Sequence, residues 1–224
     1  MFRMGSLQLR PVAYLPEKAI ERAALSLLDE HGRRWGIEIA IPIPIDDIVE
    51  RTLGLRIAWI EIEEQPGETI LARLDPDCGG VPTVQLNERR LAGHFDQYFG
   101  TEQYSLAHEA GHWVLHYLRD GDAGDAQQAF PGMALGLGAP VLCRSMDAGD
   151  RREWQAERFA AHLLLPAHLL DAALAGHDLS QGTDLAALAR RCGVSRKALT
   201  YRLRDLGHLQ ASGQIGFGAA EGSR

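Results

Sequence analysis

The chain has 224 residues, of which 46% are hydrophobic and 24% charged, and its formal net charge is −7. This length allows a sizeable core, in one domain with an appendage or in two small domains, and the composition is that of an ordinary globular protein. The negative charge argues against a surface that as a whole attracts nucleic acid or anionic membranes. We find no apolar run of signal-peptide or membrane-span length and no C-x-x-C pair among Cys78, Cys143 and Cys192, so we expect a cytoplasmic protein with reduced thiols.

The N-terminal part predicts two helices. Residues 1–15 lack a periodic pattern and are expected to be flexible. Pro16 suits the start of a helix through EKAIERAALSLLDEHG, with Gly32 as its C-terminal stop. A second short helix, ended by Gly54, is indicated by an apolar face that consists of Ile45, Ile48, Val49 and Leu53.

The hydrophobic period then changes to that of β-strands. Short β-type runs cover residues 55–62, 69–74 and 81–87, and the turn-formers EEQPGE and DPDCGG separate them. This pattern predicts a small three-stranded antiparallel sheet, which needs a helix packed on one face. Together with the helices on either side, it predicts an α+β fold.

Helical patterning resumes at about residue 101 but fails again between residues 119 and 150. That segment holds six glycines and two prolines. A loop of this length inside a compact domain is usually functional or disordered, and we expect it to act near the functional site as a lid or specificity loop. Within it, Cys143 is expected to be an inert thiol, with a thiolate that latches a metal as the alternative. Beyond it, helices are expected over residues 151–166 and 167–175.

The helix that starts near residue 101 carries a candidate metal centre in SLAHEAGHWVLH, residues 105–116. Residues four positions apart lie on the same helix face, so His108 and His112 can direct their imidazoles at one metal ion. Glu109 lies one step around the helix, where its carboxylate can take a proton from a water molecule. Two ligands and a general base are the chemical content of the H-E-x-x-H pattern.

A second helix offers the missing ligand. A catalytic zinc ion is held by three protein ligands and keeps one open position. In EWQAERFAAHLLLP, Glu153 can be the third ligand, and Glu157, one turn further on, can accept the ring N–H of a metal-bound histidine. The alternative is that these histidines and glutamates are only solvated side chains on two helix faces.

The phrases YSLAHEAGHWVLH and EWQAERFAAHLLLP resemble the ImmA/IrrE family of zinc metallopeptidases, whose hallmarks are F-T-L-A-H-E-x-G-H and E-x-x-A-N-x-F-A-x-x-L-L-x-P. The likeness covers roughly residues 17–209. It implies a zincin-like metallopeptidase domain over residues 16–176, with Glu109 as catalytic base and Zn²⁺ held by His108, His112 and Glu153. The family often has Asn where this chain has Glu157.

Peptide hydrolysis also needs a cationic or hydroxyl group that stabilises the developing oxyanion. The sequence offers four candidates and does not choose among them: His116, Tyr104, Tyr98 and His162. His116 lies one further turn along the face of His108 and His112. It can line the cleft, or it can be a fourth ligand in a structural metal site.

Residues 177–209 are expected to form a helix-turn-helix-like segment, followed by a disordered tail over residues 210–224. The turn lies at Gly193-Val194-Ser195, and Ser195 is a natural N-cap for the second helix. Residues 184–208 hold six Arg or Lys and two Asp, a local charge of +4. Direct DNA binding would use an exposed face of Arg196, Lys197, Thr200, Tyr201 and Arg204.

The alternatives for this helical pair are packing on the catalytic domain, which the family resemblance favours, and docking of a partner protein. The leading hypothesis for the whole chain is a zinc-dependent endopeptidase. By resemblance, its substrate is a helix-turn-helix repressor, cleaved in a stress or mobile-element response. The alternative is a DNA- or partner-binding regulator whose zinc site is structural.

Overall fold

The computed structural model describes residues 14–92, 99–118, 148–175, 177, 179 and 182–209. Several features named above lie outside these residues. They are residues 1–13 of the predicted flexible N-terminus, Tyr98, residues 119–147 of the predicted loop with Cys143, and the predicted tail over residues 210–224.

The described part of the chain is an α+β fold with a three-stranded sheet, which confirms the predicted class. The strands are β1 (Arg56–Ile60), β2 (Ala72–Cys78) and β3 (Val81–Asn87), and their order across the sheet is β1-β3-β2. β2 is antiparallel to β3, but β1 runs parallel to β3. The prediction of an all-antiparallel meander is therefore wrong, because the sheet is mixed.

The connection between β1 and β2 gives a physical reason for this order. The side-chain amide of Asn87, at the end of β3, donates to the carbonyl oxygen of Ile70 at 2.8 Å, and its Oδ1 accepts from the Ile62 N–H at 3.3 Å. An ion pair of 2.5 Å between Arg90 and Glu64 anchors the same connection. These contacts hold the connection against the end of β3, so β1 and β2 do not pair as a hairpin and β3 occupies the centre.

The first helix, α1 (Glu17–Trp35), is longer than predicted. It ends at Gly36, which adopts the left-handed conformation with φ of 64°, and not at Gly32. A glycine at position 32 has a packing reason instead, because an added Cβ would lie 2.9 Å from the carbonyl oxygen of Ile37. The predicted short helix is present as α2 (Ile45–Asp47) and the π-helical turn η1 (Ile48–Thr52).

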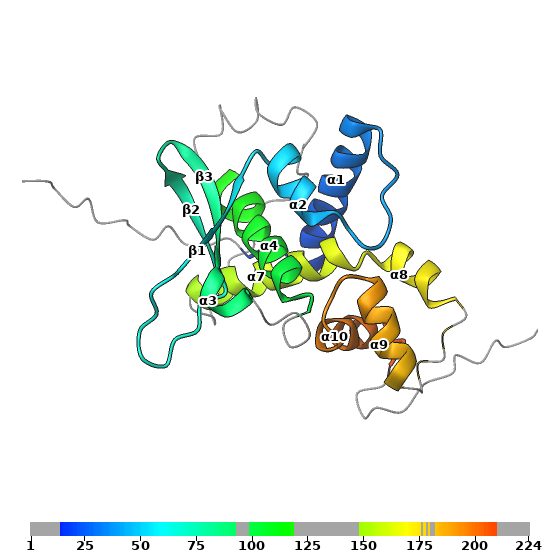
Figure 1. Ribbon diagram of the computed structural model, residues 1–224. Coiled ribbons are helices and arrows are strands. Elements are labelled where there is room, and N and C mark those ends of the chain that lie inside the picture. Colours follow the sequence, from blue (N-terminus) through cyan, green and yellow to red (C-terminus); the bar gives the residue numbers. More distant parts are fainter. Residues whose placement is uncertain are drawn as a thin grey trace, which may run out of the picture.

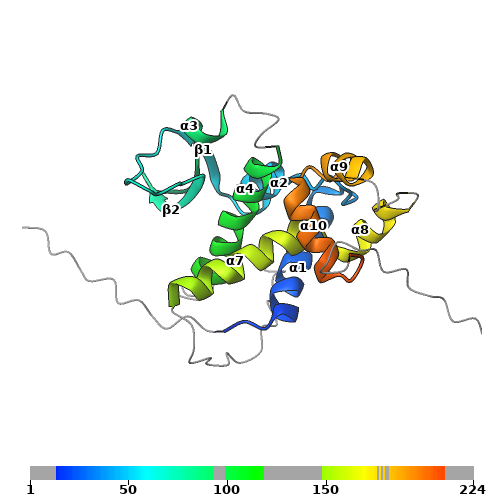
Figure 2. The same cartoon turned by 90° about the horizontal axis from the view of Figure 1, so that it is seen from below.

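Two helices cross in the middle of the molecule. They are α4 (Thr101–His112), continued by the π-helical turn η2 (Trp113–Tyr117), and α7 (Ala148–Leu164). α7 packs on both α4 and α1, while α4 also contacts β2 and β3. Figures 1 and 2 show the sheet on one side of this crossing and α9 and α10 on the other.

The remaining helices include α3 (Glu88–Leu91) after the sheet and α8 (Ala167–Leu174), which follows α7 beyond Pro166. A helical pair, α9 (Gly182–Arg191) and α10 (Arg196–Asp205), completes the described chain. Ser195 caps α10 as predicted, because its Oγ accepts from the Ala198 N–H at 3.1 Å. Among the described residues, no helix is long and apolar enough to span a membrane.

Candidate metal centre

The site is built where α4 crosses α7, and Gly111 allows the two helices to approach closely. A Cβ on Gly111 would lie 3.1 Å from the Cα of Ala156 and 3.2 Å from the Cβ of Phe159. Glycine inside a helix costs up to about 1 kcal/mol relative to alanine, so its presence here is explained by this approach. The consequence is that one face of α4 lies against the face of α7 that carries Glu153.

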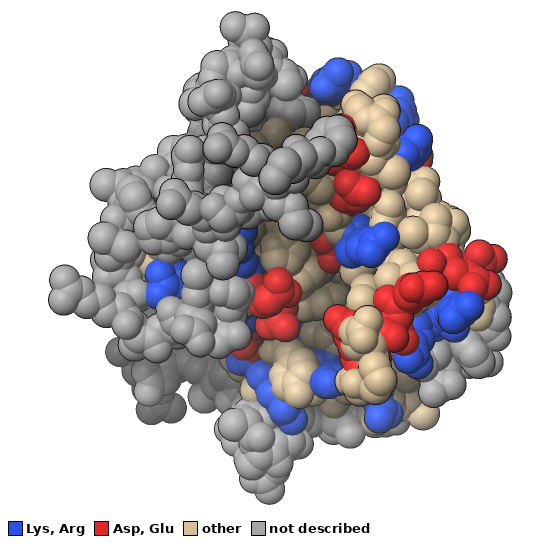
Figure 3. Space-filling view, turned by 90° about the vertical axis from the view of Figure 1, so that its left-hand side faces the viewer, with Lys and Arg blue, Asp and Glu red and all other residues tan. Residues whose placement is uncertain are grey.

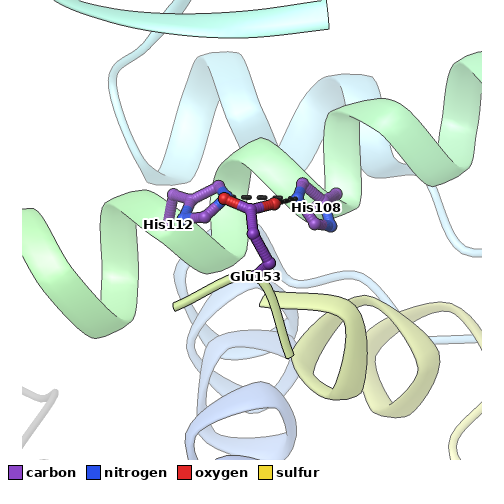
Figure 4. Close-up of side chains that lie close together, drawn as sticks. All are labelled: His108, His112 and Glu153. Carbon is purple, nitrogen blue, oxygen red and sulfur yellow. Dashed lines mark hydrogen bonds and ion pairs between the residues drawn. The ribbon is translucent and has the colours of Figure 1, made fainter. Parts of the chain in front are cut away.

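Three predicted ligands converge at this crossing (Figure 4). Nε2 of His112 lies 3.1 Å from Nε2 of His108. The Glu153 carboxylate reaches both rings, with Oε2 at 3.2 Å from Nε2 of His108 and Oε1 at 3.4 Å from Nε2 of His112. One ligand atom from each of the three residues lies within 4.8 Å of the others.

These separations suit a tetrahedral metal ion. Zinc–nitrogen and zinc–oxygen bonds of about 2.1 Å place neighbouring ligand atoms of a tetrahedron about 3.4 Å apart. The two imidazole nitrogens lie 3.1 Å apart, and each lies 3.2 to 3.4 Å from one of the two Glu153 carboxylate oxygens, so a small rotation of the carboxylate would bring one ligand atom of each residue onto a triangular face of such a tetrahedron. Two imidazoles and one carboxylate are also a donor set that zinc accepts.

The protonation state of His112 favours a metal ligand. Burial lowers the pKa of this imidazole, and the neighbouring His108 lowers it further. The ring is therefore neutral near pH 7. A neutral ring is the form that binds a metal ion, because the ligating nitrogen must present a lone pair.

Glu109 is buried in the wall of the same cleft, with 8% of its surface exposed. Burial, together with the charge of Glu153, raises the pKa of its carboxyl group to about 7. The backbone N–H of Leu74 in β2 donates a hydrogen bond to this carboxylate, and this hydrogen bond lowers the pKa. A carboxyl group with a pKa near 7 can both take up and release a proton at neutral pH.

The cleft has a volume of about 810 Å³ and runs between β2 and the α4–α7 crossing. Residues 68–74 form one wall, and α4 and α7 form the other. Figure 3 views the sheet side of the molecule, where the described surface is hollowed and acidic and basic side chains border the hollow.

Two of the four oxyanion candidates line this cleft. His116 is buried on η2, and the centroid of its ring lies 5.6 Å from that of His112. Tyr104 lies one turn before His108, and burial raises the pKa of its hydroxyl to about 12, so it remains a proton donor at neutral pH. His162, by contrast, faces α1 and α10, where its ring lies 3.3 Å from Glu17 and 3.1 Å from Arg202.

Glu157 also lines the cleft, one turn beyond Glu153. Among the hydrogen bonds between described residues, none joins Glu157 to His108 or His112. Its negative charge contributes to the raised pKa of Tyr104, which places it near that hydroxyl. Acceptance of a histidine N–H by Glu157 therefore stays a prediction.

Sequence reasoning missed two contributors to the cleft. Arg152 lines it, and its positive charge helps to lower the pKa of His112. The position of Arg152 next to Glu153 in the sequence could have pointed to its place in the cleft. The second contributor is β2, which forms one wall of the cleft. This wall could not be predicted, because it depends on the order of the strands in the sheet, which local sequence patterns do not reveal.

The predicted DNA-binding face of α10 is only partly free. Arg196, Lys197 and Arg204 are exposed, and Tyr201 is 55% exposed. Lys197 and Tyr201 also line a second cavity between α10 and α7. Arg202, between them and Arg204, is buried.

Comparisons with known proteins add a family match. The model of the Peptidase M78 family, described as the IrrE N-terminal-like domain, matches residues 144–204. A search of curated proteins found no match. Among solved structures, a Mycobacterium tuberculosis transcriptional regulator is similar, with 19% identity and a TM-score of 0.47. The match covers 88% of this chain and 58% of that one, so the chain spans little more than half the length of that protein. The resemblance to the ImmA/IrrE family that the sequence predicted is thus confirmed by the match over residues 144–204. This range holds all of α7, with Glu153 and Glu157, and the C-terminal helical pair except for the last residue of α10.

Proposed function

We propose that the protein is a zinc-dependent endopeptidase whose metal ion is held by His108, His112 and Glu153. The observation that carries this proposal is the convergence of these three side chains, with one ligand atom of each within 4.8 Å of the others, beside the buried carboxyl group of Glu109 on α4. The family match to a metallopeptidase domain supports it. Bound zinc would supply a Lewis acid that activates water and polarises the scissile carbonyl.

Glu109 is the proposed general base. Its carboxylate takes a proton from the attacking water and passes it to the leaving amine, so that the amine departs as a neutral group. Burial raises the pKa of this carboxyl group to about 7 in the metal-free protein, and the charge of a bound zinc ion would lower it, which favours the carboxylate form that accepts the proton. Tyr104 and His116 are the candidates for stabilising the oxyanion from within the described cleft.

The edge of the sheet supports a way to hold a peptide. β2 is an outer strand of the described sheet and borders the cleft. An extended peptide beside β2 would pair with it as a further strand, and main-chain hydrogen bonds would then position the scissile bond over the metal centre. Binding through the backbone suits a protein substrate.

By the family resemblance, the proposed substrate is a helix-turn-helix transcriptional repressor, and its cleavage would start a stress or mobile-element response. The substrate has to present an unfolded or loosely folded segment, because the strand beside β2 must be extended.

Replacement of Glu109 by Gln tests the mechanism. The variant should bind zinc with the stoichiometry of the wild type and unfold cooperatively, while cleavage of a proteome-derived peptide library should fall by several orders of magnitude. Cleavage is counted by mass spectrometry of new termini, and zinc by elemental analysis. Wild-type turnover by zinc-loaded Glu109→Gln would rule out this base.

A further inference from the structure

A second cavity lies beside the catalytic cleft, between the start of α4, the C-terminal half of α7 and α10. Its volume is about 550 Å³. Its apolar lining comes from α7, α10 and the turn before α10, and consists of Ala160, Ala161, Leu164, Leu165, Val194 and Ala198. A side chain of the size of Leu or Phe fits such a space.

The two cavities are neighbours, because Tyr104 and Glu157 line both of them. Thr101, which lines the second cavity, precedes His108 by seven positions, which is about 10 Å along a helix. An extended peptide advances about 3.3 Å per residue, so the second cavity lies about three residues from a scissile bond placed at the metal centre.

The wall that α10 provides is held rigidly. The turn before α10 abuts the start of α4 so closely that a Cβ on Gly100 would lie 2.4 Å from the backbone carbon of Val194. The guanidinium of buried Arg202 donates to the carbonyl oxygen of Leu165 at 3.0 Å. Arg158 of α7 pairs with Asp205 of α10 at 2.5 Å and also with Glu17 of α1.

These contacts also decide the chemistry of the occupant. Arg158 forms ion pairs with Glu17 and Asp205, and Arg202 donates to the carbonyl oxygen of Leu165. The ammonium of Lys197 lies 5.9 Å from the centre of the Tyr201 ring. Of the acidic groups, Asp205 is paired with Arg158. Three cationic and two acidic side chains line the cavity, so its charge is small, and its apolar floor suits an apolar side chain.

We propose that this second cavity is a specificity subsite, which takes a bulky apolar side chain of the substrate two to four residues from the scissile bond. The proposal rests on the proposed peptidase function. It gives the C-terminal helical pair a role as one wall of the substrate-binding groove.

The test fills the cavity from α7. Ala161 lines the cavity at intermediate exposure and is not part of the buried core, so Ala161→Phe places a ring in the proposed subsite. Ala186→Phe in α9 is the matched control, because Ala186 has intermediate exposure, lies outside both cavities and is likewise not part of the core. If Ala161→Phe unfolds, Ala198→Phe fills the same space from α10.

The probe is a cleaved peptide from the proteome-derived library and its partner with the apolar residue changed to Ala. The wild type should prefer the apolar peptide at least about tenfold in kcat/KM. Zinc-loaded Glu109→Gln should show the same preference in binding, measured by fluorescence anisotropy. Addition of Ala161→Phe should lower to about 1 both the kcat/KM ratio of the wild type and the binding ratio of Glu109→Gln. Addition of Ala186→Phe should leave both ratios unchanged.

The outcomes separate the subsite from the peptidase. If the wild type cleaves peptides without preference at these positions, or if Ala161→Phe leaves the ratio unchanged, the subsite does not exist and the peptidase proposal stands. A uniform loss for both peptides in Ala161→Phe equally overturns the subsite. If the zinc-loaded wild type cleaves no peptide, the peptidase proposal fails, and the subsite fails with it.

Discussion

At the residue scale, the candidate site is the best predicted part of the molecule. The i, i+4 spacing of His108 and His112 fixes their common face through helix geometry alone. The position of Glu153 could not follow from spacing, because it depends on where α7 crosses α4. Gly111 decides that crossing through a close approach of two backbones, which a sequence marks only as an unfavourable residue inside a helix.

The role of Glu153 gives the first prediction. Glu153→Ala leaves two protein ligands for the metal ion and should weaken zinc affinity by at least about 100-fold, as measured by competition with a chromophoric chelator. Glu50→Ala, an exposed change on η1 outside the cleft, is the control. Tight stoichiometric zinc with full activity in Glu153→Ala would show that the third ligand lies elsewhere, and Glu157 would be examined first.

Burial of Glu109 gives a prediction about pH in the metal-free protein. The folded-state pKa is raised from 4.5 to about 7, so the folded protein binds this proton more tightly than the unfolded chain. The corresponding stability is fully present below about pH 4.5 and is lost as the pH rises through about 7, with a magnitude on the order of 3 kcal/mol. Glu109→Gln does not titrate. It should therefore raise the Tm relative to the wild type more at pH 8 than at pH 5.

The control for this measurement is Glu157→Gln, because it makes the same Glu-to-Gln change at an exposed position of the same cleft. A gain in Tm for Glu109→Gln that is equal at both pH values would mean that the Glu109 carboxyl group titrates normally in the fold.

At the element scale, sequence patterns located most helices and strands but did not determine how they pair. The three β-type runs were predicted from their period, and a strand overlaps each of them. The second prediction was wrong in its bounds, because β2 (Ala72–Cys78) begins later than residue 69 and extends into DPDC, which was predicted as part of a turn. The parallel pairing of β1 with β3 was missed, because it depends on Asn87 and Glu64 holding the connection between β1 and β2. The end of α1 was also missed, since two glycines four residues apart gave the same local signal.

The contact between α4 and the turn before α10 gives a prediction at this scale. Gly100 and Gly36 both have positive φ, 75° and 64°, but only Gly100 has backbone atoms within 2.5 Å of an added Cβ. Gly36→Ala should cost about 1 kcal/mol of unfolding free energy from conformational strain alone. Gly100→Ala should cost about 1–3 kcal/mol more, because two backbones must separate.

Urea unfolding of the two variants measures the difference directly. Equal costs for Gly100→Ala and Gly36→Ala would mean that the helical pair is not docked against α4, and the second cavity would then lack a fixed wall.

At the scale of the whole molecule, the helices that carry the proposed ligands are held together by apolar packing. Leu106, Ala110, Phe159 and Leu163 are fully buried between them and their neighbours. The fold should therefore survive without a metal ion, unlike that of a small domain built around structural zinc.

Chelation tests this expectation. Removal of zinc should abolish peptidase activity and lower the Tm by the lost binding energy, while unfolding remains a single cooperative transition. Addition of zinc should restore activity. Loss of the cooperative transition on chelation would favour the alternative, a regulator whose zinc site is structural.

The central claim is that three side chains hold the metal ion and leave a position open for chemistry. Anomalous diffraction from zinc-loaded crystals, together with the zinc absorption edge, measures the ligand set directly. We expect zinc at about 2.0–2.2 Å from Nε2 of His108, Nε2 of His112 and a carboxylate oxygen of Glu153, with a non-protein fourth ligand. Zinc bound by four protein ligands, with His116 as the fourth, or bound away from these three residues, would contradict the claim.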